Sequence, residues 1–417
     1  MQRRERSDVS LAEPQPRRRL RYPTAVFTPG SDHDLIIRTV REFVERDVLP
    51  VASAMEREDA YPEELVATMG RLGLFGLNVP EQYGGVDADY TAFAGVMEEL
   101  ARAWLGLSGI LATHLVLCDV IKTFGTPEQQ QRFLPVLARG DARGALCLSE
   151  SEAGSDLQSI RTTATRGGDA SRDVYHINGS KMWITNARHA QLFLVLTKTD
   201  ASAKPAHRGI SAFVAEKGQP GLTVGRDIPK LGYRGLETCE VHFDNFPIPA
   251  ANLIGGVEGR GFAQVMTGFE AERLNLAARA LGLARAAFED AIRYAQQRVT
   301  FGKPIAEHQA IQLKLADMAT RIEASRLLTY SAAHKKDGGE RCELEIAMAK
   351  VFASDTAVEV SLEAMKILGG NGYSKDFPVE RYYRDAPLTL IGGGTGEIAR
   401  LLIARRLLER HRVGDKD

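Results

Sequence analysis

The sequence lacks the features that define several large protein classes. Only four of its 417 residues are cysteine, they lie far apart, and no C-x-x-C pair occurs. A disulfide framework or a structural zinc site is therefore not expected, and a reducing cytoplasm fits best. The sequence also contains no run of about 18 consecutive apolar residues, so we expect no segment that spans a membrane.

An excess of charge of one sign is also missing. Lys and Arg number 53 against 54 for Asp and Glu, which gives a formal net charge of -1. That balance excludes the broad basic surface expected of a nucleic-acid or anionic-membrane binder. Hydrophobic residues make up 44% and charged residues 26% of the chain, which is typical of a folded protein. The length predicts two or three domains.

Several catalytic motifs are absent as well. The sequence has no H-E-x-x-H, no P-loop lysine motif and no G-x-S-x-G elbow. Residues 369–372 and 392–396 are rich in glycine, but neither segment follows a strand within a βαβ unit. A Rossmann dinucleotide site is therefore not expected. These glycines still permit close approach of a ligand to the backbone.

Residues 1–30 differ from the rest of the chain. They combine many arginines with prolines and show no apolar periodicity, so we predict a flexible Arg/Pro-rich arm. A mitochondrial transit peptide is the alternative, but Glu5, Asp8 and Glu13 count against it because such peptides are poor in acidic residues. We therefore favour the bacterial cytoplasm over the mitochondrial matrix.

The next region, residues 31–144, reads as helical. Helical periodicity begins at Ser31, and Pro50 is expected to end the first helix. Thr126, Pro127 and Glu128 form a helix start, with an N-cap, a first-turn proline and an acid that matches the helix dipole.

The sequence pattern changes from helical to strand-like over residues 145–260. Apolar runs at 192–196, 210–214 and 239–243 read as strands separated by turn signals, and they predict a small antiparallel sheet or barrel. Residues 261–417 then return to long amphipathic helices, which predicts a helix bundle. The expected fold is mainly α with a central β domain.

Two segments carry a resemblance to a known family. Residues 147–159 and 369–373, the latter followed by Asp376, Arg381 and Asp385, resemble the two signatures of the acyl-CoA dehydrogenase family. Residues 181–186 and 298–304 resemble further blocks of that family. The resemblance implies an N-terminal helical domain, a middle β-barrel and a C-terminal four-helix bundle. It also implies FAD as cofactor, a homotetramer built as paired dimers and electron transfer to an electron-transfer flavoprotein.

The resemblance implies a first set of ligand contacts around the flavin. Leu148 and Ser149 should lie along the flavin ring, Trp183 should stack near it, and Thr185 should bond close to N5. Gly154 and Ser155 should also approach the cofactor, with Ser155 facing the pantetheine arm of the substrate. Taken singly, Trp183 would more often be a core aromatic and Ser149 an ordinary strand hydroxyl, so the ordered blocks carry the inference.

A second set of contacts is implied at other positions. They comprise the cofactor contacts Arg298, Thr300, Phe301, Lys366, Gly369, Gly370, Thr395 and Glu397, and the substrate contact Arg273. By resemblance, the first three bind the FAD of a neighbouring subunit, and the next three approach that same cofactor. Lys366 stands where the family usually has Gln, Asp or Glu, and Ser151 replaces a common proline.

The implied reaction removes the α-proton of an acyl thioester while the β-hydrogen leaves as hydride to the flavin, so it needs a carboxylate base. Many family members carry this carboxylate before the Gly-Thr pair, where this chain has Gly393. Isovaleryl-CoA and long-chain acyl-CoA dehydrogenases instead place it in a Glu-Arg-Leu context, which here is Glu272, Arg273 and Leu274. Glu272 is therefore the predicted base, with Glu270 as its competitor, and the Gly393 N–H is an oxyanion donor.

The predicted function is FAD-dependent dehydrogenation of an acyl-CoA. One alternative keeps the chemistry on a carrier-protein or biosynthetic thioester. Another is a flavin monooxygenase on the same fold, against which Glu272 argues. A third is a non-catalytic protein that retains the fold. The sequence leaves the length and branching of the acyl chain open.

Overall fold

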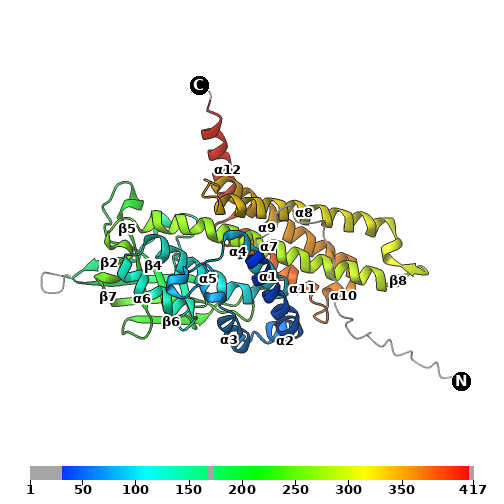
Figure 1. The fold of residues 1–417 in the computed structure, drawn as a ribbon, viewed down its shortest axis with the longest axis horizontal. Helices are drawn as coiled ribbons and strands as arrows, with labels where there is room; N and C mark the ends of the chain where they lie inside the picture. The colour runs from blue at the N-terminus through cyan, green and yellow to red at the C-terminus, as the bar shows by residue number, and fades with distance from the viewer. Residues whose placement is uncertain (1–30, 168–172, 413–417) are drawn as a thin grey trace.

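The computed structural model describes residues 31–167 and 173–412. The molecule is elongated, with a β-sheet at one end and long helices that run to the other end (Figure 1). A first group of helices contacts both the sheet and the long helices. The predicted arm, residues 1–30, lies outside the described residues.

The first group of helices covers the predicted helical region. Its members are α1 (Ser31–Phe43), α2 (Leu49–Glu58), α3 (Glu63–Arg71), α4 (Tyr90–Ala103), α5 (Leu105–Phe124) and α6 (Pro127–Ala138). The predicted start of α6 is confirmed, because the Gln129 N–H donates to Thr126 Oγ1 at 3.3 Å and the Thr126 N–H donates to Gln129 Oε1 at 3.0 Å. This reciprocal pair satisfies two N–H groups that the helix leaves without partners.

The expectation that Pro50 ends the first helix is wrong. A π-helical turn, Val44–Val48, joins α1 directly to α2, and Pro50 lies in the first turn of α2. Proline is tolerated there because the first-turn N–H groups have no partner within their own helix.

Helix α5 qualifies the expectation that no segment spans a membrane. Among the described residues it alone is long and apolar enough to cross one by length and composition, with a mean hydropathy of 1.5. However, 89% of this stretch is buried inside the protein. Its apolar character is therefore explained by packing in the core.

The central region forms one seven-stranded sheet. Its strands are β1 (Gly144–Cys147), β2 (Thr163–Arg166), β3 (Val174–Thr185), β4 (Leu192–Lys198), β5 (Ile210–Glu216), β6 (Leu222–Asp227) and β7 (Thr238–Pro249). The order is β1-β4-β2-β3-β7-β6, with β5 paired to β4. The predicted runs correspond to β4, β5 and β7. The expected antiparallel pairing holds for β2–β3, β3–β7, β4–β5 and β6–β7, whereas β1 and β2 pair with β4 in parallel.

The remaining helices form the bundle. They are α7 (Gly261–Gln297), α8 (Gln309–Asp337), α9 (Glu343–Leu368), the short α10 (Gly370–Tyr373), α11 (Val379–Ile391) and α12 (Gly396–Arg410). A short hairpin, whose strands β8 (Val299–Thr300) and β9 (Lys303–Pro304) have two residues each, connects α7 to α8. Sequence analysis missed α11, which contains a proline and lies between two glycine-rich segments. The predicted class, mainly α with a central β domain, is confirmed.

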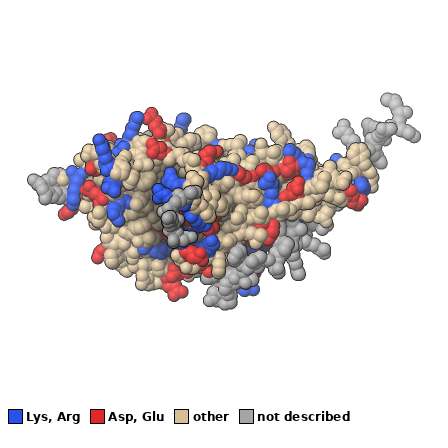
Figure 2. Space-filling model, turned by 90° about the horizontal axis from the view of Figure 1, so that it is seen from above, with Lys and Arg blue, Asp and Glu red and all other residues tan. Residues whose placement is uncertain are grey.

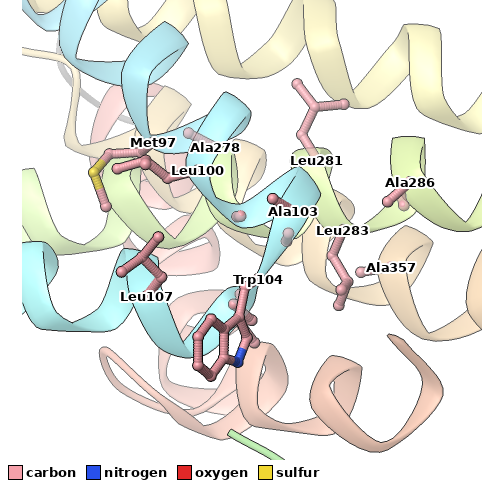
Figure 3. Close-up of a cluster of buried hydrophobic side chains, with 14 of the residues drawn as sticks. Met97, Leu100, Ala103, Trp104, Leu107, Ala278, Leu281, Leu283, Ala286 and Ala357 are labelled. Carbon is pink, nitrogen blue, oxygen red and sulfur yellow. The ribbon is translucent and has the colours of Figure 1, made fainter. Parts of the chain in front are cut away.

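The core is continuous between the first helices and the bundle. In Figure 3, side chains of α4, α5 and the residue between them lie against alanines and leucines of α7 and an alanine of α9. The residues labelled there are Met97, Leu100, Ala103, Trp104, Leu107, Ala278, Leu281, Leu283, Ala286 and Ala357. Because alanines face the partner helices, α7 packs close to both α4 and α9.

Buried charges reinforce this arrangement. Arg285 of α7 contacts Glu98 and Glu99 of α4 at 2.9 and 3.0 Å, and Arg326 of α8 contacts Glu98 at 3.1 Å. Charges on the surface are mixed, since Figure 2 shows Lys and Arg interspersed with Asp and Glu on the face it presents.

Candidate active site

Glu272 lies on the buried side of α7, and its residue is only 9% exposed. The Asn275 side-chain amide donates a hydrogen bond to Glu272 Oε2 at 3.2 Å. Burial raises the pKa of Glu272 to about 7, against the opposing effects of the Arg279 charge and the Asn275 hydrogen bond. A carboxylate with such a pKa is suited to act as a general base near neutral pH.

Gly393 lies directly opposite this carboxylate, in the loop between α11 and α12. Its φ is +60° and that of Gly394 is +88°, a backbone conformation that favours glycine. A Cβ added to Gly393 would lie 3.5 Å from Glu272 Cγ and 3.9 Å from Glu272 Oε1. The two predicted catalytic positions are therefore brought together, and the side chain of Glu272 occupies the space beside Gly393.

The competitor Glu270 faces elsewhere. Its Oε2 lies 3.5 Å from Lys336 Nζ on α8. Arg273 is half-buried, and burial lowers its pKa against the attraction of Glu270 and Glu343. Glu272 is thus the acid of the Glu-Arg-Leu segment that meets the glycine loop.

The predicted flavin-binding residues form a small platform at the end of β1. Leu148 is buried, and Ser149 is tied to β3 by two hydrogen bonds. The Ser149 hydroxyl donates to Met182 O at 2.8 Å, and the Met182 N–H donates to Ser149 O at 2.9 Å. These bonds hold the turn after β1 beside the segment of β3 that precedes Trp183.

Trp183 is the most unusual residue of this platform. Its φ is +66°, and its residue is 54% exposed. It lies where the register of β3 and β7 shifts, between Lys181 and Ile184. A bulky residue with strained backbone and an exposed aromatic ring is typical of a ligand-binding position. The exposure also excludes the ordinary alternative that Trp183 is a core aromatic.

The other residues of the first set lie nearby in the chain but are less constrained. Thr185 is half-buried and pairs with Thr238 of β7. Gly154 and Ser155 lie on an exposed bend, and a Cβ added to Gly154 would meet nothing within 4 Å. Gly154 is therefore not required by the packing of this chain alone.

Three members of the second set lie at the C-terminal end of α7. Arg298 caps the C-terminus of α7, Thr300 belongs to the β8–β9 hairpin, and Phe301 at its tip is 97% exposed. Residues 272 and 298 are 26 positions apart on one helix, which corresponds to about 39 Å. Figure 1 shows this hairpin at the far end of the molecule from the sheet. One chain therefore cannot bring Trp183 and Phe301 to a single cofactor.

Lys366, Gly369 and Gly370 lie at this same end. The Asn371 amide donates to the Tyr294 hydroxyl at 3.0 Å, which places α10 beside the last turn of α7. Gly369 has a φ of +61° and ends α9. Lys366 donates to Glu363 within α9 at 2.5 Å.

Thr395 and Glu397 follow the glycine loop at the start of α12. Thr395 Oγ1 accepts a hydrogen bond from the Ile398 N–H at 3.4 Å, so it is the N-cap of α12. Glu397 is exposed in the first turn, and a hydrogen bond from its own backbone N–H and one from the Thr395 side chain lower its pKa.

Sequence analysis missed three groups beside Glu272. Asn275 and Arg279 follow it by three and seven residues on α7, and helical periodicity alone could have placed them on its face. Tyr233 comes from the segment between β6 and β7, and its hydroxyl accepts a hydrogen bond from Arg279 at 2.9 Å. No local pattern signals that long-range contact.

Comparison with known proteins shows the family of the chain. Three acyl-CoA dehydrogenase family models match the chain, with the N-terminal domain at residues 30–141, the middle domain at 145–246 and the C-terminal domain at 259–408. The chain belongs to the acyl-CoA dehydrogenase family. The resemblance inferred from the sequence is thereby confirmed.

Individual relatives are similar over most of the chain. An acyl-CoA dehydrogenase of Bacillus subtilis is 46% identical over 372 residues, which is 89% of this chain and 96% of that protein. The mitochondrial short-chain specific acyl-CoA dehydrogenase of Bos taurus is 41% identical over 382 residues, 91% of each chain. The structure of butyryl-CoA dehydrogenase from Megasphaera elsdenii superposes with a TM-score of 0.88 at 37% identity and covers 92% of this chain and 100% of its own.

Proposed function

We propose that this chain is an FAD-dependent acyl-CoA dehydrogenase that converts an acyl-CoA to the trans-2-enoyl-CoA. The observation that carries this proposal is the buried Glu272 carboxylate opposite the Gly393 loop. Glu272 takes the proton from the α-carbon of the thioester. The N–H of Gly393 stabilises the charge that develops on the thioester oxygen. FAD held by Leu148, Ser149 and Trp183 would supply the acceptor for the β-hydrogen, which leaves as a hydride.

The residues of the β1–β3 platform fit such a cofactor. The exposed ring of Trp183 offers a stacking surface beside the Ser149 turn, and its backbone has a positive φ that bulky residues rarely adopt. The buried side chain of Leu148 makes part of this platform apolar. The same platform would serve a flavin monooxygenase, but that chemistry needs no carboxylate base at Glu272, so the dehydrogenase is favoured. A carrier-protein thioester is likewise not favoured.

Short acyl chains are the proposed substrates within this class. Two of the relatives named above, the short-chain specific enzyme and butyryl-CoA dehydrogenase, carry such substrates in their names. We place the enzyme in fatty acid metabolism, with an electron-transfer flavoprotein as acceptor.

The proposed assembly is a homotetramer built as paired dimers. The separation of the β8–β9 hairpin from the β1–β3 platform supports it, because a neighbouring subunit could supply the hairpin residues that one chain holds too far away. The proposed location is the bacterial cytoplasm, which is supported by the four cysteines, all free and buried.

Anaerobic titration of the purified protein with straight-chain and branched acyl-CoAs tests the proposed reaction. We expect short acyl-CoAs to bleach the bound flavin, because transfer of the hydride reduces it. If the flavin is present and no thioester reduces it, the dehydrogenase proposal is wrong. A colourless protein that binds no added FAD would instead indicate a non-catalytic member of the fold.

A further inference from the structure

Arg279 occupies a distinctive place relative to the catalytic glutamate. It follows Glu272 by seven residues on α7, which puts both side chains on one helix face about 10.5 Å apart along the axis. Its charge acts on Glu272, and the two groups make no direct hydrogen bond among those found in the described residues. Arg279 therefore lies on the same face as the base, two helical turns away.

The guanidinium of Arg279 is buried without a carboxylate partner. The residue is 3% exposed, and it donates to Ser108 Oγ at 2.9 Å, to Tyr233 Oη at 2.9 Å and to Leu105 O at 3.4 Å. All three acceptors are neutral. Among the described residues, no carboxylate oxygen lies within 4.0 Å of the guanidinium nitrogens of Arg279, which is the limit for an ion pair. Buried Arg102, by contrast, contacts Glu99 at 2.9 Å.

The Tyr233 hydroxyl, beside Arg279, has a hydrogen for which the described residues offer no acceptor. Tyr233 is 7% exposed, and its hydroxyl accepts from Arg279. Because a guanidinium has no lone pair to offer, the phenolic hydrogen must find an acceptor elsewhere. Within residues 31–167 and 173–412 the Tyr233 hydroxyl donates no hydrogen bond. Burial raises the pKa of Tyr233, against the effect of Arg279, so the hydroxyl keeps its hydrogen at neutral pH.

These groups are held in place by close packing. The Tyr233 N–H donates to Asp385 Oδ1 at 2.6 Å, which anchors the segment on α11. A Cβ added to Gly109 of α5 would lie 1.7 Å from the Tyr233 hydroxyl, so only glycine admits the ring there. Ser108, the residue before it, holds the other side of the guanidinium. The donors are thus positioned by α5, α7 and α11 together.

A buried cation with neutral partners and an unused hydroxyl beside it are suited to an anion. We propose that Arg279 and Tyr233 form the far end of the acyl pocket and select a short acyl-CoA that carries a carboxylate at the end remote from the thioester. This inference rests on the proposed function, because it takes the acyl chain to start beside Glu272. An alkyl end would leave the Arg279 charge without a carboxylate partner and the Tyr233 hydroxyl hydrogen without an acceptor.

Matched thioesters test the inference on the holoenzyme. Glutaryl-CoA carries the carboxylate, its terminal amide is neutral with the same shape, and 5-methylhexanoyl-CoA is the alkyl counterpart. We expect kcat/KM for flavin reduction to be at least about tenfold higher for glutaryl-CoA than for either counterpart, as a charge-assisted bond requires. The ratio is measured within one enzyme preparation, so differences in stability between variants cancel.

Variants assign the preference to its residues. In Arg279→Gln the glutaryl-to-amide ratio should fall close to one, while Arg279→Lys should keep part of it. Arg381→Gln is the control, because Arg381 is also buried without an ion pair but bonds to Ala103 O. It should leave the ratio unchanged. Equal use of acid and amide by the wild type, or a ratio that survives in Arg279→Gln, would overturn the inference.

Binding to the Glu272→Gln holoenzyme separates this inference from the proposed function. That variant lacks the base, so the Kd of glutaryl-CoA and of its amide can be measured without turnover by the shift of the flavin spectrum. Tighter binding of the acid supports the anionic pocket even if no thioester is oxidised by the wild type. Equal Kd values would overturn the pocket even if dehydrogenation is observed.

Discussion

Lys181 and Glu150 form a buried ion pair behind the proposed flavin platform, with Nζ 2.9 Å from Oε1. Lys181 Nζ also donates to Leu148 O at 3.2 Å, and Glu150 accepts from the hydroxyl of Thr162 at 2.6 Å. The pair therefore joins the turn after β1 to the strand that carries Trp183.

Lys181→Met should weaken FAD binding, because it releases the Leu148 turn and leaves Glu150 buried without its cation. The loss of one partner of a buried pair costs about 3–5 kcal/mol of folding free energy. The measurements are the Kd of the apoprotein for FAD and its unfolding free energy. Lys122→Met is the matched control, since Lys122 pairs with Asp119 at 3.2 Å in the first helices. Equal loss of FAD affinity in both variants would contradict a specific role for Lys181.

Glu272→Gln should stabilise the fold at high pH. The pKa of Glu272 is raised in the folded chain from 4.5 to about 7, so the folded state holds its proton more tightly than the unfolded state. The ionised carboxylate therefore costs stability that grows as pH rises through 4.5 and levels off above about 7, at about 3 kcal/mol. Urea unfolding of both proteins at pH 4 and pH 8 checks this. A difference of equal size at both pH values would show that Glu272 does not titrate in this way.

The same group should control the pH dependence of activity. A base must be ionised to accept the α-proton, so kcat/KM should rise with pH up to about 7 and then level off. Steady-state kinetics from pH 5 to 9 provides the profile. A flat profile across this range would assign the base elsewhere.

The space shared by Glu272 and Gly393 predicts that the base can be moved. Glu272→Gly should lose about 10²–10⁴-fold in kcat, the usual contribution of a general base. The double variant with Gly393→Glu should recover part of this loss, because a side chain at 393 enters the space that Glu272 leaves. Recovery will be incomplete, since the φ of +60° costs a glutamate about 1–2 kcal/mol. The rate of flavin reduction is the readout, and a double variant no faster than Glu272→Gly would refute the shared space.

Local sequence signals predicted much of the fold. The capping pattern at Thr126 located α6, and the apolar runs located three strands, because these features depend on residues close together in the chain. The parallel partners of β4 escaped prediction because pairing between distant strands leaves no local pattern. The prediction that Pro50 ends the first helix was wrong because a proline occurs at the start of a helix as well as after its end.

The residues of the candidate site also divide into those that local sequence patterns could predict and those that depend on long-range packing. Glu272 and Gly393 were predicted as catalytic positions from their resemblance to family motifs, and the structure adds that they lie side by side. Arg279 and Tyr233 were missed because their meeting depends on how the segment after β6 packs on α7. Burial distinguishes an ordinary surface arginine from one at a functional site, and the burial of a residue depends on the whole fold.

The exposed tip of the β8–β9 hairpin predicts a link between assembly and cofactor binding. Arg298→Ala combined with Phe301→Ala should lower FAD affinity and reduce the size of the assembly, because the proposed neighbour would lose an aromatic anchor and a phosphate partner. Loss of one charge-assisted hydrogen bond corresponds to about a ten- to hundredfold weaker Kd. Light scattering and FAD titration measure both effects. Val257→Ala is the control, since Val257 is exposed before α7 begins and away from the hairpin. If the double variant keeps both its size and its flavin, the hairpin does not serve a neighbouring subunit.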